Sequence, residues 1–148
     1  MNAPYDAVIA VLQNYFEGLY RGDTMILRQV FHPAAIYACA TGGELLRLAM
    51  DEYFPVVEKR PSPASLGQAR TDRILSIDFI GPVTALARVE CSILPRLFTD
   101  SLTLVLVDAA GRSSRRYFTT SLRRQRRSGG GAAHAASRRA PYGRCMSA

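Results

Sequence analysis

The chain contains no tryptophan, two histidines, three cysteines and one lysine among its 148 residues. The cysteines Cys39, Cys91 and Cys145 are odd in number, and none stands in a Cys-x-x-Cys or Cys/His spacing. A disulfide framework is indicated by an even set of spaced cysteines, and a zinc site by clustered cysteines and histidines. The sequence therefore suggests neither, and we expect no metal ion and no cofactor.

Long hydrophobic runs are also absent from the sequence. No apolar stretch reaches the roughly 20 residues that a membrane-spanning helix needs, and no signal-peptide pattern precedes the first expected helix. There is no internal repeat. Hydrophobic residues make up 48% of the composition, which is enough for the core of one domain. These features predict a cytoplasmic protein without a membrane partner.

Acidic residues are missing from the C-terminal part of the chain. Residues 109–148 hold ten arginines and no acid, whereas residues 1–108 hold nine basic and all twelve acidic residues. The formal net charge of +7 therefore belongs to the tail alone. Its RRQRR and SRR runs resemble an anion-binding patch, but no interleaved aromatic residues or groove-fitting helix support nucleic-acid binding. We expect residues 109–148 to be a disordered, low-complexity tail without a nucleic-acid partner.

Residues 83–108 contain the strongest pattern in the chain, two long strands joined at Pro95. From residue 83 to residue 94, every odd position is an apolar residue or cysteine, and the even positions are mixed. This period-two alternation predicts a half-buried antiparallel strand. In the second strand Leu102, Leu104 and Leu106 share one face. Strands this long twist strongly and need helices to cover one face.

The helices expected to cover this sheet lie upstream. In residues 2–21, Val8, Leu12, Tyr15 and Leu19 recur at helical spacing, and Asp23 is placed to cap a second helix over residues 24–31. A third helix is expected over residues 51–60. Further strands are expected over residues 36–39, 44–48 and 70–80. This order predicts an α+β fold with helices on one face of a curled antiparallel sheet.

Six segments stand in a distinctive order: QNYFEGLYRGD (13–23), FHPAAIYA (31–38), RPSP (60–63), ILSIDFIG (74–81), ARVEC (87–91) and LFTDSLTLVLVD (97–108). Over about residues 5–108 they resemble the nuclear-transport-factor-2-like superfamily, and within it small bacterial proteins labelled lumazine-binding. The resemblance implies a cone-shaped α+β barrel, with a curled antiparallel sheet packed on three N-terminal helices around one pocket. It also implies a homodimer formed through the sheet. The superfamily includes isomerases, dehydratases, cyclases and members without a known reaction, so the fold does not settle the function.

The resemblance also implies a closing strand after Asp108, roughly Gly-Arg-Trp-x-Ile-Val-x-Lys-Val-Phe-His. Residues 109–127 read AAGRSSRRYFTTSLRRQRR instead, without strand alternation. A one-base change of reading frame just after Asp108 converts one back-translation of this segment into Gly-Arg-Trp-Gln-Ile-Val-Ala-Lys-Val-Phe-His. We therefore expect a domain over residues 1–108, a last strand that is missing or degraded, and a frame-shifted tail.

Tyr15 and Asp100 are the main catalytic candidates. Aligning their segments with ketosteroid isomerases, which belong to the superfamily, places them at the two oxyanion-hole donor positions. A tyrosine hydroxyl and a neutral carboxyl can together stabilise an enolate. The general base of that family aligns with Cys39, a poor substitute for a carboxylate. The alternative is that Tyr15 is a residue of an amphipathic helix and Asp100 a solvent or turn carboxylate.

The remaining candidates each have a structural alternative. His32 is either an acid or base in the pocket or a residue that ends the second helix. Glu90 and Asp78 form a carboxylate pair if they point inward, and pair with Arg88 or Arg73 if they point outward. Tyr37, Tyr53, Phe54, Phe79 and Phe98 either stack on a flat ligand or belong to the core.

Three functions follow from these candidates. The first is a pocket that binds a small aromatic or heterocyclic molecule; the second is an isomerase, dehydratase or cyclase that uses Tyr15 and Asp100. The third is a dimeric interaction module with a vestigial pocket. An apolar pocket with one or two polar groups favours the first, polar groups converging at the barrel mouth favour the second, and a filled barrel favours the third.

Overall fold

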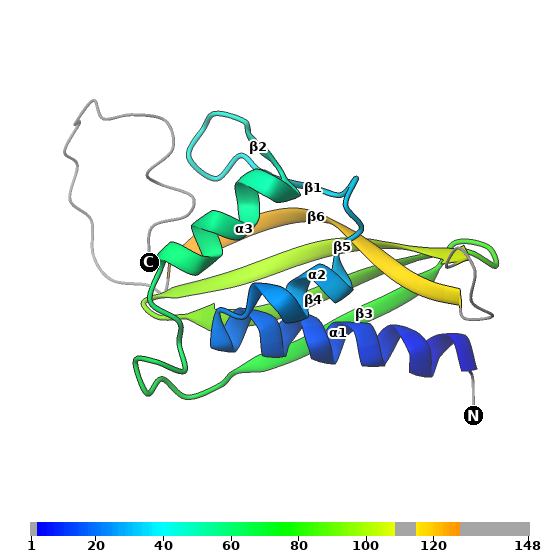
Figure 1. Ribbon diagram of the computed structural model, residues 1–148, viewed down its shortest axis with the longest axis horizontal. Coiled ribbons are helices and arrows are strands. Elements are labelled where there is room, and N and C mark those ends of the chain that lie inside the picture. The colour runs from blue at the N-terminus through cyan, green and yellow to red at the C-terminus, as the bar shows by residue number, and fades with distance from the viewer. Residues whose placement is uncertain (1–2, 109–114, 128–148) are drawn as a thin grey trace.

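The computed structural model describes residues 3–108 and 115–127, which form helices packed on one side of a curled sheet (Figure 1). The helices are α1 (Ala3–Arg21), α2 (Thr24–Val30) and α3 (Met50–Lys59). The strands are β1 (Ile36–Cys39), β2 (Leu46–Ala49), β3 (Asp72–Phe79), β4 (Thr84–Ile93), β5 (Arg96–Asp108) and β6 (Arg115–Arg127). The predicted α+β class and the predicted order of elements up to β5 are confirmed.

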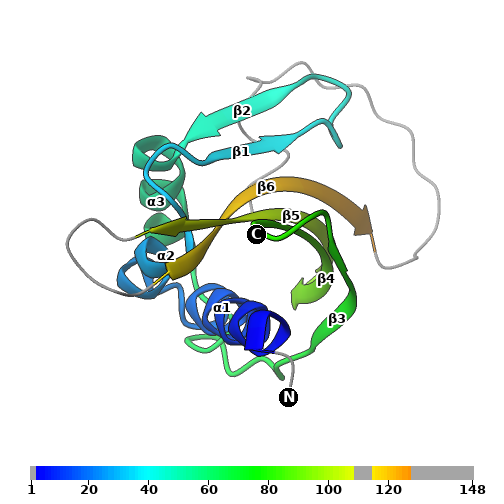
Figure 2. The same ribbon diagram turned by 90° about the vertical axis from the view of Figure 1, so that its right-hand side faces the viewer.

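The strands form one sheet in the order β2-β1-β6-β5-β4-β3. Neighbouring strands are antiparallel except β1 and β6, which are parallel. Strands β3 to β6 curl around α1, as the end view in Figure 2 shows. Among the described strands, β2 and β3 remain edges, so the sheet is a bent cone rather than a closed barrel.

The alternation predicted for residues 83–108 is present in β4 and β5. The residues of this face that are buried are Ala85, Ala87, Val89, Cys91 and Ile93 of β4, and Phe98, Asp100, Leu102 and Leu104 of β5. The register pairs Val89 with Asp100 and Ala87 with Leu102. Because directly paired residues point to the same side of a sheet, these side chains form one inner surface that faces α1.

The first two helices cover this inner surface with the residues predicted to do so. Val8 and Leu12 are fully buried on α1. Asp23 caps α2 by accepting hydrogen bonds from the backbone N–H groups of Met25 and Ile26, at 2.9 and 3.3 Å. α1 approaches α2 closely at Gly18, where an added Cβ would lie 2.6 Å from Cδ2 of Leu27.

The structure departs from the sequence prediction at Arg115–Arg127. We expected no intact last strand, but this segment forms the 13-residue strand β6, paired with β5 along its whole length and with β1. Its register places Arg123 opposite Asp100. The physical reason lies in the backbone: β5 offers hydrogen-bonding groups along one edge, and the segment contains no proline or glycine to interrupt a ladder.

The other predictions about the C-terminal part stay predictions. They are a domain boundary after Asp108, a disordered tail and a shifted reading frame. Residues 109–114 and 128–148 lie outside the described residues. Sequencing the DNA around codon 108 tests the reading frame directly.

Candidate functional site

Tyr15 and Asp100 meet inside the fold. Tyr15 lies on the sheet-facing side of α1, and Asp100 lies on the inner face of β5. The Tyr15 hydroxyl donates a hydrogen bond of 2.5 Å to Oδ2 of Asp100. The side chains are 2% and 0% exposed, respectively. The structure thus brings the two predicted oxyanion donors into contact, while their catalytic role stays a prediction.

Aromatic rings surround this pair on the side of the helices. Phe16 and Phe31 contact the Tyr15 ring, with centroids at 5.8 and 6.0 Å. Phe31 also packs edge-on against Tyr53 at 5.9 Å, and Tyr53 stacks on Tyr37 with centroids 4.9 Å apart. Such tilted, edge-on and offset-stacked arrangements are the favoured ones for aromatic pairs. These rings fill the space between the helices and the sheet with a mostly apolar core.

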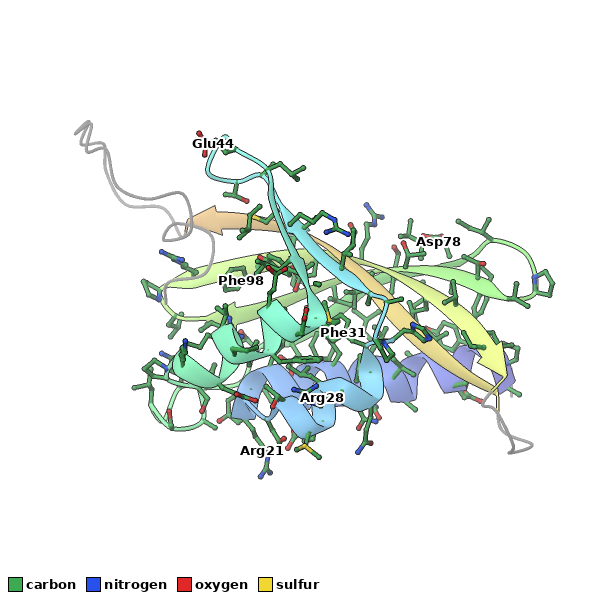
Figure 3. All side chains as sticks on the ribbon, turned by 45° about the horizontal axis from the view of Figure 1, so that its top comes forward. Arg21, Arg28, Phe31, Glu44, Asp78 and Phe98 are labelled. Carbon is green, nitrogen blue, oxygen red and sulfur yellow. The ribbon has the colours of Figure 1, made fainter. Side chains whose placement is uncertain are left out.

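A pocket of about 470 Å³ opens on the other side of these rings, where the end of α2 faces the start of α3. We call it the α2–α3 pocket; its lining residues are Arg28, Phe31, Pro33, Met50, Asp51 and Phe54. Its floor is apolar, because Phe31, Met50 and Phe54 are each at most 3% exposed. Its charged groups, Arg28 and Asp51, are exposed. Figure 3 shows Arg28 and Phe31 at this junction of the helices.

Local sequence places these groups at the pocket. Arg28 and Phe31 are three residues apart at the end of α2, so they project from the same side of the chain. The Arg28 guanidinium lies over the Phe54 ring, 4.4 Å from its centroid, which joins α2 to α3 by a cation–π contact. α3 begins at Met50, and Glu52 fixes this start by accepting a hydrogen bond from the Ala49 N–H at 2.9 Å.

Some of these pocket residues escaped the sequence analysis. Phe54 was among the predicted ligand-binding residues, but Arg28, Phe31, Pro33, Met50 and Asp51 were not. A usable signal was present in the FHP segment, since an aromatic residue directly after a helix is well placed to pack against the next helix. The partner helix could not be chosen from periodicity, because the two helix ends are brought together by the β1–β2 hairpin between them.

The contacts of His32 favour its role as the residue that ends the second helix over a role as an acid or base in the pocket. It lies in the turn after α2, and its Nδ1 accepts a hydrogen bond of 3.1 Å from the Ala34 N–H. Its carbonyl accepts another from Ala35 at 2.8 Å. Both contacts stabilise the turn that ends the helix. His32 does not line the α2–α3 pocket.

The acidic candidates on the sheet point outward. Glu90 accepts a hydrogen bond of 2.7 Å from Arg73, and the register pairs these two residues on the face opposite Val89. Asp78 lies near the far end of β3, on the same outer face, where Oδ2 accepts a hydrogen bond of 3.3 Å from Ser76 (Figure 3). Glu90 therefore pairs with Arg73, as the outward alternative predicts, whereas the contact of Asp78 is with Ser76 rather than with an arginine. Both carboxylates lie on the face of the sheet opposite Asp100.

The remaining aromatic candidates divide between core and surface. Tyr37 and Tyr53 are each 1% exposed and stack on one another in the core. Phe98 is 3% exposed on the inner face of β5, whereas Phe79 is 38% exposed at the end of β3. The α2–α3 pocket is lined by none of these four residues.

Charged groups form a second polar cluster at the C-terminal end of α1. Glu17 accepts hydrogen bonds from Arg21 and from Arg70, and Arg70 also donates to Asp72. The hydrogen bond from Arg21, followed by that from Arg70, lowers the pKa of Glu17. The bond to Asp72 is the main cause that raises the pKa of Arg70. The cluster ties the segment before β3 to α1 and contributes no lining residue to the α2–α3 pocket.

Neither a metal site nor a membrane span is found in the part of the chain that the structure describes. Over residues 3–108 and 115–127, no group of three or more histidine, cysteine, aspartate and glutamate side chains is arranged to hold a metal ion. Over the same residues, no helix combines the length and the hydropathy that crossing a membrane requires.

Residues 3–112 match the model of a protein family described as "Putative lumazine-binding". The chain belongs to this lumazine-binding family. The match spans the three helices and strands β1 to β5, and so includes both Tyr15 and Asp100 as well as the α2–α3 pocket. A comparison with curated proteins finds no match.

Solved structures with the same fold are NTF2-like proteins. A protein of unknown function from Silicibacter pomeroyi is 23% identical, with a TM-score of 0.71 over 84% of this chain and 97% of its own. One from Shewanella baltica is 23% identical, with a TM-score of 0.72 over 85% and 96%. One from Methylobacillus flagellatus is 20% identical, with a TM-score of 0.70 over 85% and 94%. At these identities the likeness establishes the NTF2-like fold of this lumazine-binding family member and leaves its ligand open.

Proposed function

We propose that the protein binds a small planar aromatic or heterocyclic molecule in the α2–α3 pocket. The observation that carries this proposal is the composition of the pocket, an apolar floor of Phe31, Met50 and Phe54 with two charged groups at its rim. Its volume of about 470 Å³ lies within the roughly 300–1,000 Å³ typical of small-molecule sites. The family description supports the same class of ligand.

The charged groups suggest how such a ligand is oriented. The Arg28 guanidinium only donates hydrogen bonds, and an ionised Asp51 carboxylate only accepts them. A ring whose edge carries both a carbonyl oxygen and an N–H group matches this pair, as an apolar hydrocarbon ring does not. Lumazine has such edges and is therefore the first probe, chosen for its chemistry as well as for the family's description.

Calorimetric titration with lumazine tests this proposal. We expect saturable binding by the wild-type protein and an affinity about tenfold lower for Arg28→Ala, since one charge-assisted hydrogen bond contributes on the order of 1.4 kcal/mol or more. Arg47→Ala is the matched control, because Arg47 is an exposed arginine on β2 that does not line the pocket. No saturable binding of lumazine or of other planar heterocycles with the same edge, or equal losses in the two variants, contradicts the proposal.

The second candidate function is an isomerase, dehydratase or cyclase that uses Tyr15 and Asp100. The direct contact between their side chains supports it. Its demands are stricter: the carboxyl must carry a proton to donate to an oxyanion, and a base must reach the substrate. Cys39, at the position of the family's base, is 3% exposed on β1 and is disulfide-bonded, so it has no thiol to act as a base. An enolate mimic that binds the wild type and Tyr15→Phe equally well excludes this function.

The third candidate is a homodimer formed through the outer face of the sheet. Leu86, Thr103 and Val105 are half-buried on this face, opposite the inner residues of β4 and β5. A surface of valine, leucine and threonine loses little by desolvation when a second copy covers it. Sedimentation equilibrium of the wild type and of Leu86→Asp tests the idea; a wild type that stays monomeric at high micromolar concentration contradicts it.

A further inference from the structure

Phe31 lies between the α2–α3 pocket and the buried pair of Tyr15 and Asp100. One side of its ring lines the pocket. The ring also packs edge-on against Tyr15, with centroids 6.0 Å apart, and against Tyr53, at 5.9 Å. The Tyr15 hydroxyl in turn donates a hydrogen bond to Asp100. A single aromatic ring therefore separates the open pocket from the ring whose hydroxyl belongs to the buried pair.

The backbone holds this ring in place. Phe31 follows the last residue of α2, and its N–H donates a hydrogen bond of 2.9 Å to the Leu27 carbonyl. Pro33 follows two residues later, and His32 closes the turn around it by accepting hydrogen bonds from the N–H groups of Ala34 and Ala35. Phe54, on α3, contacts the Phe31 ring, and the two ring centroids are 6.4 Å apart. The position of the ring is thus defined by the chain on both sides and by the neighbouring helix.

We propose that the Phe31 side chain determines the depth, and with it the ligand specificity, of the α2–α3 pocket. With phenylalanine at this position, a ligand rests on the apolar floor and meets polar groups only at the rim. With a smaller residue, the pocket extends to Tyr15 and becomes a deep site for a single ring that carries a hydroxyl group. The inference rests on the proposed role of this pocket as a ligand site, but its probes differ from those of the proposed function.

The chemistry of the deeper site follows from the pair at its end. A tyrosine hydroxyl can accept a hydrogen bond while it donates one, so the Tyr15 oxygen that donates to Asp100 can accept from a phenol. The rest of the site is apolar and would accept toluene or phenol alike. Engineered apolar cavities of about 150 Å³ are known to take up benzene-sized rings. A preference for phenol over toluene therefore reports contact with Tyr15.

The experiment compares Phe31→Ala with Phe16→Ala, both checked for cooperative unfolding. Phe16 is a matched control because its ring is 5% exposed and lies 5.8 Å from Tyr15, but it does not line the α2–α3 pocket. Phenol and toluene are titrated against each variant and against the wild type, and binding is followed by NMR. We expect Phe31→Ala to bind phenol about tenfold more tightly than the wild type and Phe16→Ala do.

A second comparison identifies the polar end of the site. In Phe31→Ala, phenol should bind more tightly than toluene, and adding Tyr15→Phe should remove this preference while toluene binding persists. The inference is overturned if folded Phe31→Ala gains no phenol affinity, if Phe16→Ala gains as much, or if the preference survives Tyr15→Phe. Should Phe31→Ala not fold, Phe31→Leu is used with the same criteria.

The outcome is separable from that of the proposed function. A wild type that ignores lumazine, together with a Phe31→Ala variant that gains phenol, overturns the proposed function and supports the depth inference. A wild type that binds lumazine through Arg28, together with a Phe31→Ala variant that gains no phenol affinity, supports the proposed function and overturns the depth inference.

Discussion

The Tyr15–Asp100 pair and the α2–α3 pocket solve the problem of placing polar groups beside an aromatic core in opposite ways. The pair is buried, and its polar atoms meet one another at 2.5 Å. The pocket keeps its apolar floor buried and leaves Arg28 and Asp51 at an exposed rim. Buried polar groups contribute strongly to stability and are costly to disturb, whereas exposed ones are cheap to change and available to a ligand. The comparison favours the pocket as the binding site and the pair as part of the folded core.

Substitutions of the two aspartates, Asp100 in the pair and Asp51 at the pocket, test this difference most directly. We expect Asp100→Ala to lower the free energy of unfolding by on the order of 3 kcal/mol, because it removes the acceptor of the buried Tyr15 hydroxyl and leaves a void. Asp51→Ala, the exposed counterpart, should cost less than about 1 kcal/mol, from its position in the first turn of α3. Urea denaturation measures both. Similar losses would show that burial does not separate the two regions.

The next largest effect is expected where α2 is held against α1. Gly18→Ala adds a Cβ that would lie 2.6 Å from the Leu27 side chain, so the buried Leu27 side chain or the two helices must shift. We expect a loss of about 2 kcal/mol in the free energy of unfolding. Because α2 carries Arg28 and Phe31, lumazine affinity should fall as well. Gly42→Ala is the control, since no atom lies within 4 Å of its added Cβ; equal unfolding midpoints for both variants would contradict the close approach.

A smaller effect is expected at the rim of the pocket. Arg28→Ala removes the cation–π contact with Phe54 and should lower stability by about 0.5–1 kcal/mol, the range for exposed contacts of this kind. Its effect on lumazine binding should be larger than its effect on stability. Thermal unfolding with and without lumazine measures both on one sample. A loss of stability larger than that of Asp100→Ala would reverse the assignment of core and binding site.

The smallest effect is expected at Glu17, which lies two residues from Tyr15 but is only half-buried. Its pKa is lowered in the folded state by Arg21 and Arg70, from an ordinary value of 4.5. The contribution of a carboxylate with a lowered pKa is present above the unfolded pKa and is lost as the pH falls through the folded one. Between about pH 6 and pH 3 the wild type should therefore lose slightly more stability than Glu17→Gln does. Glu44→Gln, at the exposed turn between β1 and β2 (Figure 3), should follow the wild type.

The sequence was sufficient to predict a feature where burial of one face of a strand or helix determines the pattern of apolar residues. The period-two alternation in residues 83–108 identified the inner face of β4 and β5, because burial of one face forces that pattern. The stripe on α1 identified Tyr15 as a residue facing the sheet, and the family resemblance paired it with Asp100. What the sequence could not supply was the meeting of α2 with α3, since that contact depends on how the β1–β2 hairpin returns the chain.

The error at β6 has a related cause. The arginine-rich segment 115–127 lacks the alternation of a half-buried strand, and so an intact last strand was not expected there. Strand pairing, however, depends on backbone hydrogen bonds. Without β6, one edge of β5 would be unpaired, and a segment that supplies backbone donors and acceptors can pair with it, as β6 does. Side-chain patterns predict which face of a strand is buried. Their absence does not exclude a strand that forms by backbone pairing with a neighbouring edge.

The position of β6 makes the distant end of the chain part of the pocket's support. In the strand order, β6 is the element that joins the β1–β2 hairpin to β5, β4 and β3. α3 starts directly after β2, so the wall that carries Met50 and Phe54 is connected to the main sheet through backbone bonds of β6. Loosening β6 would therefore release hairpin and helix together as one cooperative unit. In hydrogen exchange, the amides of β1, β2 and α3 should lose protection in step with those of β6, while β4 remains protected.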